Sequence, residues 1–159
     1  MAAIRVQPSV SGQVKRYISE VAGLHKLALF MAAMLLSHLA WSVEIVSNRS
    51  VNLNSLSLAS ARSIFGMRQV KWPDDSRIQV FVLADKHPTH VALCKERLNL
   101  FPYQLRQSWD RLVFSGMAQA PIEVANEEEL INRVAATPGA IGYVRKVKPN
   151  DAIKIISVQ

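Results

Sequence analysis

SIFG at residues 63–66, WDRLVFSG at residues 109–116 and PGAIGYV at residues 138–144 are the phrases that decide the fold of this chain. Each joins aromatic or branched apolar residues to a glycine, a combination that suits a helix or strand entering a core beside a tight turn. We therefore expect the phrases to supply core packing rather than chemistry. The side chains expected in the core are Phe65, Trp109, Phe114, Ile141 and Tyr143.

The segments around these phrases switch between strand and helix patterns. Short apolar stretches predict strands at residues 43–46, 77–83, 121–125, 139–144 and 153–158. Helical spacing predicts helices at residues 55–65, from Pro88 to about Leu98, from Pro102 to Gly116, and onward from Asn126. This succession belongs to the α/β class, and we expect a three-layer sandwich with a mixed sheet.

The three phrases in this order, with Pro121 after the second, resemble the C-terminal part of the phosphate-binding proteins that serve phosphate ABC transporters, especially their short, single-lobe relatives. The likeness covers most of the chain after Trp41. It implies one lobe of a periplasmic-binding-protein-like fold at residues 43–159, which binds a solute and is not an enzyme. The partners that it implies are phosphate or another small oxyanion, and an ABC transporter permease or another envelope protein.

In that family, one loop between a strand and a helix reads Arg-x-Asp-x-Ser-Gly-Thr, and its guanidinium, hydroxyls and backbone N–H groups hold the anion. The corresponding stretch here is LADKHPT at residues 83–89, in which Asp85 and Thr89 match. Leu83 stands at the position of the Arg, His87 replaces the Ser, and Pro88 removes a backbone donor. Since a hydrogen bond to a charged group contributes about 1.5–3 kcal/mol, the resemblance implies weak or altered anion binding by Asp85, His87 and Thr89.

A second polar segment, SNRS at residues 47–50, follows the first predicted strand. Ligands of open α/β sheets tend to bind at the carboxyl ends of strands. Ser47, Asn48 and Ser50 are therefore predicted to contribute to the same anion site. An ordinary polar loop is the alternative interpretation.

The beginning of the chain has the pattern of an export leader. The 159 residues contain 19 Lys plus Arg against 12 Asp plus Glu, and several of these cations precede an uncharged apolar run at residues 27–36 that is too short to span a bilayer as a helix. Ala40 and Ser42 follow it at the spacing of a signal-peptidase site. We predict a signal peptide at residues 1–42 and a periplasmic location for residues 43–159. A buried helix and a retained anchor are the alternatives.

The sequence predicts no catalytic, cofactor or metal site. His87 and His90 are three apart, but no third ligand completes the spacing of a metal site, so we expect a solvent-facing pair. Three consecutive carboxylates, Glu127 to Glu129, predict a solvated helix start. The single cysteine, Cys94, is on the apolar side of a predicted helix, which predicts a buried, inert thiol. The basic residues are scattered, which argues against nucleic-acid binding.

Two functions remain open from the sequence. One is a solute-binding domain with weak or altered recognition of phosphate or a related oxyanion. The other is an interaction module that has lost its ligand and docks on an envelope or membrane protein. The missing Arg at position 83 and the absence of a second lobe favour the latter, whereas the resemblance itself favours the former.

Overall fold

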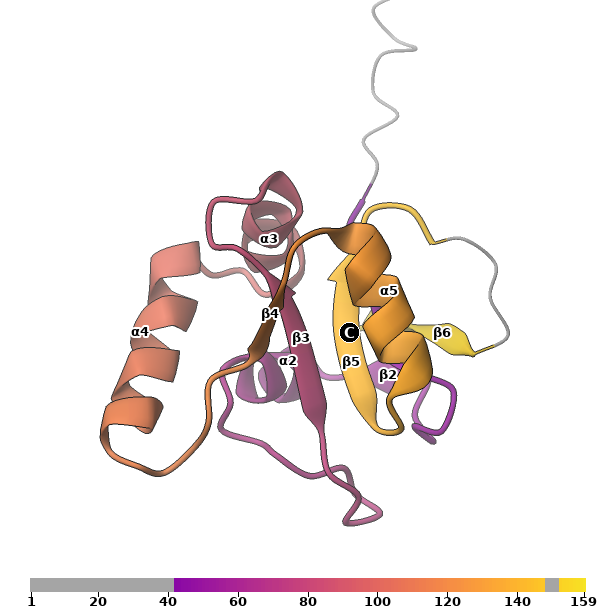
Figure 1. Ribbon diagram of the computed structural model, residues 1–159, viewed down its shortest axis with the longest axis horizontal. Helices are drawn as coiled ribbons and strands as arrows, with labels where there is room; N and C mark the ends of the chain where they lie inside the picture. Colours follow the sequence, from indigo (N-terminus) through magenta and orange to yellow (C-terminus); the bar gives the residue numbers. More distant parts are fainter. Residues whose placement is uncertain (1–41, 148–151) are drawn as a thin grey trace, which may run out of the picture. The chain divides into compact units, whose positions relative to one another are not determined.

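The computed structural model describes residues 42–147 and 152–159, so the predicted leader lies outside the described residues except for Ser42. The described chain forms a six-stranded sheet in the order β2-β6-β1-β5-β3-β4 (Figure 1). β1 is antiparallel to both of its neighbours, whereas the pairs β2–β6, β5–β3 and β3–β4 are parallel. β1 therefore runs against every other strand. The strands are β1 (Glu44–Asn48), β2 (Ser55–Leu56), β3 (Gln79–Leu83), β4 (Ile122–Val124), β5 (Ala140–Val144) and β6 (Ile153–Val158).

The helices begin at residues suited to that position. Ser57 and Asn126 cap α2 and α5 with their side-chain oxygens, which accept from backbone N–H groups three residues later. Proline occupies the first turn of α3 and of α4, where its missing N–H is not needed. The helices are α2 (Leu58–Phe65), α3 (Pro88–Ala92), the π-helix η1 (Leu93–Arg97), α4 (Pro102–Phe114) and α5 (Glu127–Ala136).

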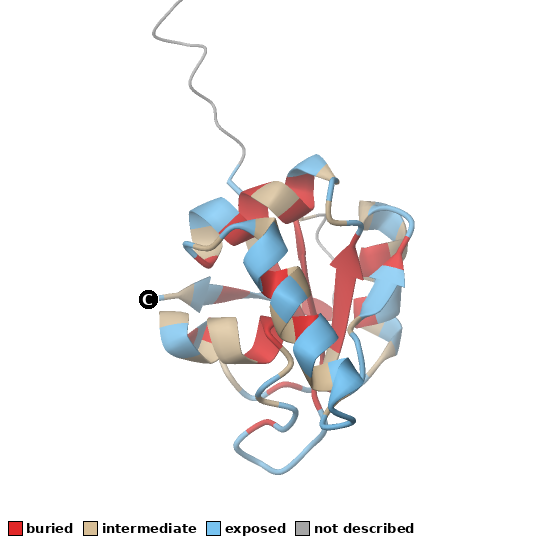
Figure 2. Ribbon diagram, turned by 90° about the vertical axis from the view of Figure 1, so that its left-hand side faces the viewer, coloured by how far each residue is buried: buried red, intermediate tan, exposed pale blue. Residues whose placement is uncertain are grey.

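Gly142 and Tyr143 show how the two faces of the sheet are covered. A Cβ on Gly142 would lie 2.5 Å from Cδ2 of Leu130, so the absence of a side chain lets α5 pack closely on this face. The next residue, Tyr143, points to the opposite face, where its ring meets that of Phe65 in α2 at 5.9 Å. Helices thus cover both faces of the sheet (Figures 1 and 2). The predicted three-layer α/β sandwich with a mixed sheet is confirmed.

Apolar residues fill the centre of the sheet. All five residues of β5 are buried, as are the last four of β3, because helices cover these strands on both sides (Figure 2). Trp109 of α4 is also buried, and its indole N–H donates to the carbonyl oxygen of Phe65 at 2.7 Å. This bond joins two of the three predicted core phrases, residues 63–66 and 109–116.

Two predictions made from local pattern are wrong. Phe114 was expected in the core, but it is 89% exposed. It follows the buried Trp109 by five residues, which at 100° per residue places it about 140° around the helix from the buried side. The helix predicted at residues 55–65 begins only at Leu58, because Ser55 and Leu56 pair with β6 as strand β2.

Candidate functional site

The predicted site residues lie at two different ends of the sheet. Ser47 of β1 is level with Ile141 of β5, which is level with Val80 of β3. Val80 precedes Leu83, the last residue of β3, by three positions, or about 10 Å of extended strand. Because β1 runs antiparallel to the other strands, its carboxyl end meets the amino end of β3. The structure therefore does not bring residues 47–50 together with the loop at residues 84–89.

Near the amino end of β3, two of the predicted site residues, Asn48 and Ser50, make structural hydrogen bonds to other elements. Asn48 is buried, and its amide nitrogen donates to the carbonyl oxygens of Val134 and Ala135, both at 2.9 Å. These carbonyls belong to the last turn of α5, where the backbone N–H of Thr137 donates to Val134 only at 3.4 Å. The hydroxyl of Ser50 accepts from the backbone N–H of Gly139 at 2.9 Å. Asn48 and Ser50 thus anchor α5 and the start of β5.

Ser47 differs from these neighbours. It is fully buried, and its hydroxyl oxygen has no hydrogen-bond partner within the described residues. The side chain alternates with Val46 and Asn48, so it points to the face of the sheet opposite α5. It is enclosed in the core rather than open to a ligand.

The second group lies at the carboxyl end of β3, where the loop at residues 84–87 leads into α3. Asp85 accepts from Nε and Nη2 of Arg106, each at 2.8 Å, which makes a two-pronged ion pair. The side-chain hydrogen bond to Asp85 raises the pKa of Arg106 above its ordinary value. The guanidinium of Arg106 also lies 4.9 Å from the centre of the Trp109 ring, over its face. Sequence reasoning missed Arg106, because it is 21 residues from Asp85 and belongs to a different element.

Thr89 is held by a second carboxylate. Its hydroxyl donates to Oε1 of Glu127, the first residue of α5, and the backbone N–H of Arg145 donates to Oε2 of the same carboxylate at 2.9 Å. Two donors from separate elements therefore converge on one negative charge. The prediction of a wholly solvated helix start is wrong for Glu127, which is half-buried, because its side chain turns toward α3 and β5. Glu129 does cap the helix start, since it accepts from the backbone N–H of Ala125.

His87 also uses a donor of this loop. It is the N-cap of α3, and its Nδ1 accepts from the backbone N–H of Thr89 at 3.2 Å. Both the hydroxyl and the backbone N–H of Thr89 are thus bonded to side chains of the chain itself. In the resembled loop these two groups would face an anion. Here they face Glu127 and His87.

His90 is fully buried, so the prediction that it faces solvent is wrong. Its Nδ1 lies 2.6 Å from the hydroxyl of Tyr143, and its Nε2 lies 3.6 Å from Sγ of Cys94. The Tyr143 hydroxyl also accepts from the backbone N–H of Leu83 at 2.8 Å, so it links β3 to the His90 imidazole. The spacing His90 to Cys94, one helical turn on the apolar side, is the signal that could have indicated this.

Burial disfavours the charged forms of the cluster formed by His90, Cys94 and Tyr143. Desolvation lowers the pKa of His90 and raises the pKa of Cys94 to about 12. Desolvation also raises the pKa of Tyr143 above its ordinary value. The prediction that Cys94 is buried is confirmed. The three side chains form a polar link inside the core.

Residues 42–147 and 152–159 contain no group of three His, Cys, Asp or Glu side chains that could hold a metal ion. Within the same ranges, no helix combines the length and the apolar character needed to cross a membrane.

Comparison with known proteins shows a shared fold. No family model and no curated protein matches the sequence. Similar solved structures include a protein described as a phosphate ABC transporter substrate-binding protein with bound phosphate, from Clostridium perfringens (12% identity, TM-score 0.54). Others are one described as a possible phosphate-binding protein, from Planctomyces limnophilus DSM 3776 (16%, 0.53), and PstS from Borrelia burgdorferi (15%, 0.50).

These alignments cover 74% of this chain in each case, but 44%, 41% and 47% of the solved chains, in the same order. The chain therefore spans less than half the length of the proteins that it resembles. At this level of identity the likeness establishes a fold shared with lobes of periplasmic binding proteins. The neighbours are binding proteins rather than enzymes.

Proposed function

We propose that this chain is a non-catalytic binding module, built on a single lobe of the periplasmic-binding-protein type, that recognises a partner protein of the cell envelope instead of capturing phosphate tightly. The observation that carries the proposal is the contact of Thr89 with Glu127. A residue that matches the anion-binding loop already donates its hydroxyl to a carboxylate of the same chain. The export leader, the domain at residues 43–159 and membership of the phosphate-binding family are parts of this proposal.

The charges around the loop argue against tight phosphate capture. A phosphate bound to the Thr89 hydroxyl would have to displace the Glu127 side chain. Asp85, four residues before Thr89, would remain in place. The negative charge of Asp85 would then repel the phosphate electrostatically. Arg106 offsets part of this repulsion, but both of its bonded nitrogens already face Asp85. Both donors of Thr89, the residue of this loop that matches the anion-binding motif, are thus already bonded within the chain.

Weak oxyanion binding is the second candidate function. It is supported by the convergence of the Thr89 hydroxyl and the Arg145 backbone N–H on one carboxylate, because a phosphate oxygen could use the same two donors. The phosphate-binding neighbours of similar fold point the same way. In this alternative the Glu127 carboxylate and the anion compete for the same two donors, so the dissociation constant for phosphate stays in the millimolar range.

Calorimetric titration of the full chain with inorganic phosphate distinguishes the two functions. The interaction module predicts no saturable heat up to about 10 mM phosphate, whereas the second candidate predicts a dissociation constant near 1 mM. Sulfate at equal ionic strength controls for nonspecific anion effects. Micromolar binding of phosphate by the unaltered chain would overturn the proposal.

A further inference from the structure

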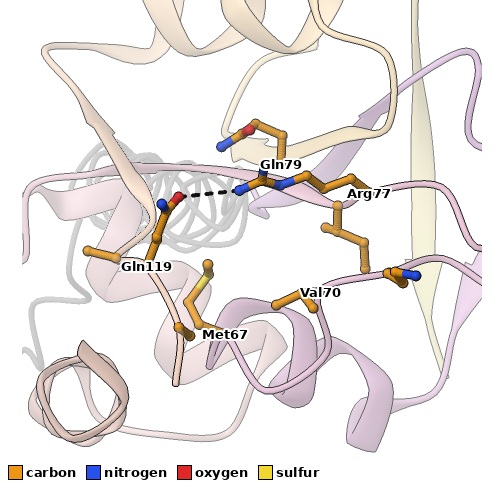
Figure 3. A pocket seen from close by; sticks show the side chains of 9 residues that line it. Met67, Val70, Arg77, Gln79 and Gln119 are labelled. Carbon is orange, nitrogen blue, oxygen red and sulfur yellow. Dashed lines mark hydrogen bonds between the residues drawn. The ribbon is translucent and has the colours of Figure 1, made fainter. Parts of the chain in front are cut away.

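A groove opens to solvent at the amino end of β3, at the opposite end of that strand from the loop at residues 84–87. Figure 3 shows Met67 and Val70 on one side of it, Arg77 and Gln79 on the other, and Gln119 beside them. Its volume is about 310 Å³. That volume is at the lower end of the range for small-molecule sites and is sufficient for one large apolar side chain with its backbone.

The lining of this groove combines an apolar floor with cationic and amide groups. The apolar side chains are Met67, Val70, Ile78, Ala118 and Ala120, and the polar ones are Lys71, Arg77, Gln79 and Gln119. None of these lining residues carries a carboxylate. Val70 is 46% exposed, so part of the floor is accessible. The groove thus offers burial to an apolar group and attraction to a negative one.

Arg77 is the cation best placed to recognise a ligand. Its Nη2 reaches toward Oε1 of Gln119 at 3.3 Å, longer than the usual 2.9–3.0 Å for such a bond (Figure 3). Lys71 is less available, because its ammonium lies 2.8 Å from a carboxylate oxygen of Asp75. Lys71 and Arg77 face each other across an antiparallel bridge, which holds both cations at the same rim.

We propose that this groove binds the C-terminus of a partner polypeptide, with an apolar last side chain on the floor and the terminal carboxylate on Arg77. The proposal rests on the proposed function as an interaction module and names the feature of the partner that is recognised. Charge complementarity selects the carboxylate, since the lining is cationic and has no acidic member. The amides of Gln79 and Gln119 suit a peptide backbone, whereas a fatty acid would need a longer enclosed apolar channel than this open groove.

Two-dimensional NMR of the isotope-labelled full chain tests the groove. The probe is the tripeptide acetyl-Ala-Ala-Leu with a free carboxylate, compared with the same peptide amidated at its end and with acetyl-Ala-Ala-Asn. Saturable shifts are expected at the backbone amides of Met67, Val70 and Gln119, with a dissociation constant in the millimolar range. The amidated and Asn-terminated peptides are expected to bind at least tenfold more weakly.

Variants connect the binding to the cation. Arg77→Gln is expected to weaken the free-acid peptide at least fivefold, whereas Arg133→Gln, on the exposed side of α5, leaves it unchanged. Shifts outside the groove, equal binding of the amidated peptide, no binding at 10 mM, or an Arg77→Gln variant that binds normally would each overturn the inference. Octanoate that binds as tightly as the peptide would overturn the choice of a polypeptide. Phosphate added to the same sample and shifting the amides near Thr89 at micromolar concentration would overturn the proposed function separately.

Discussion

Replacing Glu127 with alanine tests whether its carboxylate occupies the position where an anion would bind, between the Thr89 hydroxyl and the Arg145 backbone N–H. The change removes the acceptor of both the Thr89 hydroxyl and the Arg145 backbone N–H. A hydrogen bond to a charged group contributes about 1.5–3 kcal/mol, and Glu127 is half-buried, so the two bonds together should be worth about 2–3 kcal/mol of unfolding free energy. For a domain of this size that corresponds to a fall in Tm of about 8–12 °C.

Glu128→Ala is the matched control. Glu128 is the next residue of α5, carries the same charge at the same helix terminus and is exposed. Its loss should change the unfolding free energy by no more than about 0.5 kcal/mol. The two variants share the same loss of charge near the helix dipole, so their difference isolates the contacts of Glu127.

Thermal unfolding followed by circular dichroism, with and without 10 mM phosphate, is the assay. We expect phosphate to raise the Tm of Glu127→Ala by several degrees, because an anion can bind where the carboxylate was removed. The Tm of the unaltered chain and of Glu128→Ala should not change. An equal fall in Tm for the two variants would refute the argument that the Glu127 carboxylate is held by these two hydrogen bonds.

Three further predictions follow from the contacts of single residues. Asn48→Ala should lower the unfolding free energy by about 2–3 kcal/mol in urea denaturation, because it removes two buried hydrogen bonds from the end of α5. A loss below about 0.5 kcal/mol would contradict the anchoring role. Burial lowers the pKa of His90, so below pH 6.5 the unfolded chain binds a proton that the folded chain does not, and the unfolding free energy should fall with decreasing pH. Urea denaturation at several pH values should show that the unfolding free energy of His90→Gln depends less on pH between 6.5 and 5. An unchanged pH dependence would count against a neutral His90. Phe114→Ser should shift the urea midpoint by less than the equivalent of about 0.5 kcal/mol, and a loss above 2 kcal/mol would show that Phe114 is buried after all.

The α/β layering could be predicted from the sequence because the spacing of apolar residues within each segment indicates a helix or a strand. The spacing of Leu105 and Trp109 marks the buried side of α4, and the continuous apolar run of β5 marks a strand covered on both faces. Phe114 is apolar and close to buried residues in the sequence, which favours a core position, but its angle around α4 places it in solvent. The error concerned one residue and left the fold class unaffected.

The candidate site could not be assembled in the same way. Ser47 and Asn48 follow a strand, but their position relative to Asp85 depends on the direction in which β1 runs, and strand direction has no local signature. The partner of Thr89 is 38 residues away, and the partner of Asp85 is 21 residues away. The sequence itself shows Leu83 where the resembled motif has an Arg, whereas the bonds of Thr89 to His87 and Glu127 are evident only in three dimensions.

A crystal structure of the chain grown in phosphate, at a resolution that shows single oxygen atoms, tests the central claim most directly. The claim predicts the Glu127 carboxylate bonded to the Thr89 hydroxyl and the Arg145 backbone N–H, with no phosphate in the loop at residues 84–89. A phosphate bonded to Thr89, with Glu127 turned away into solvent, would contradict it.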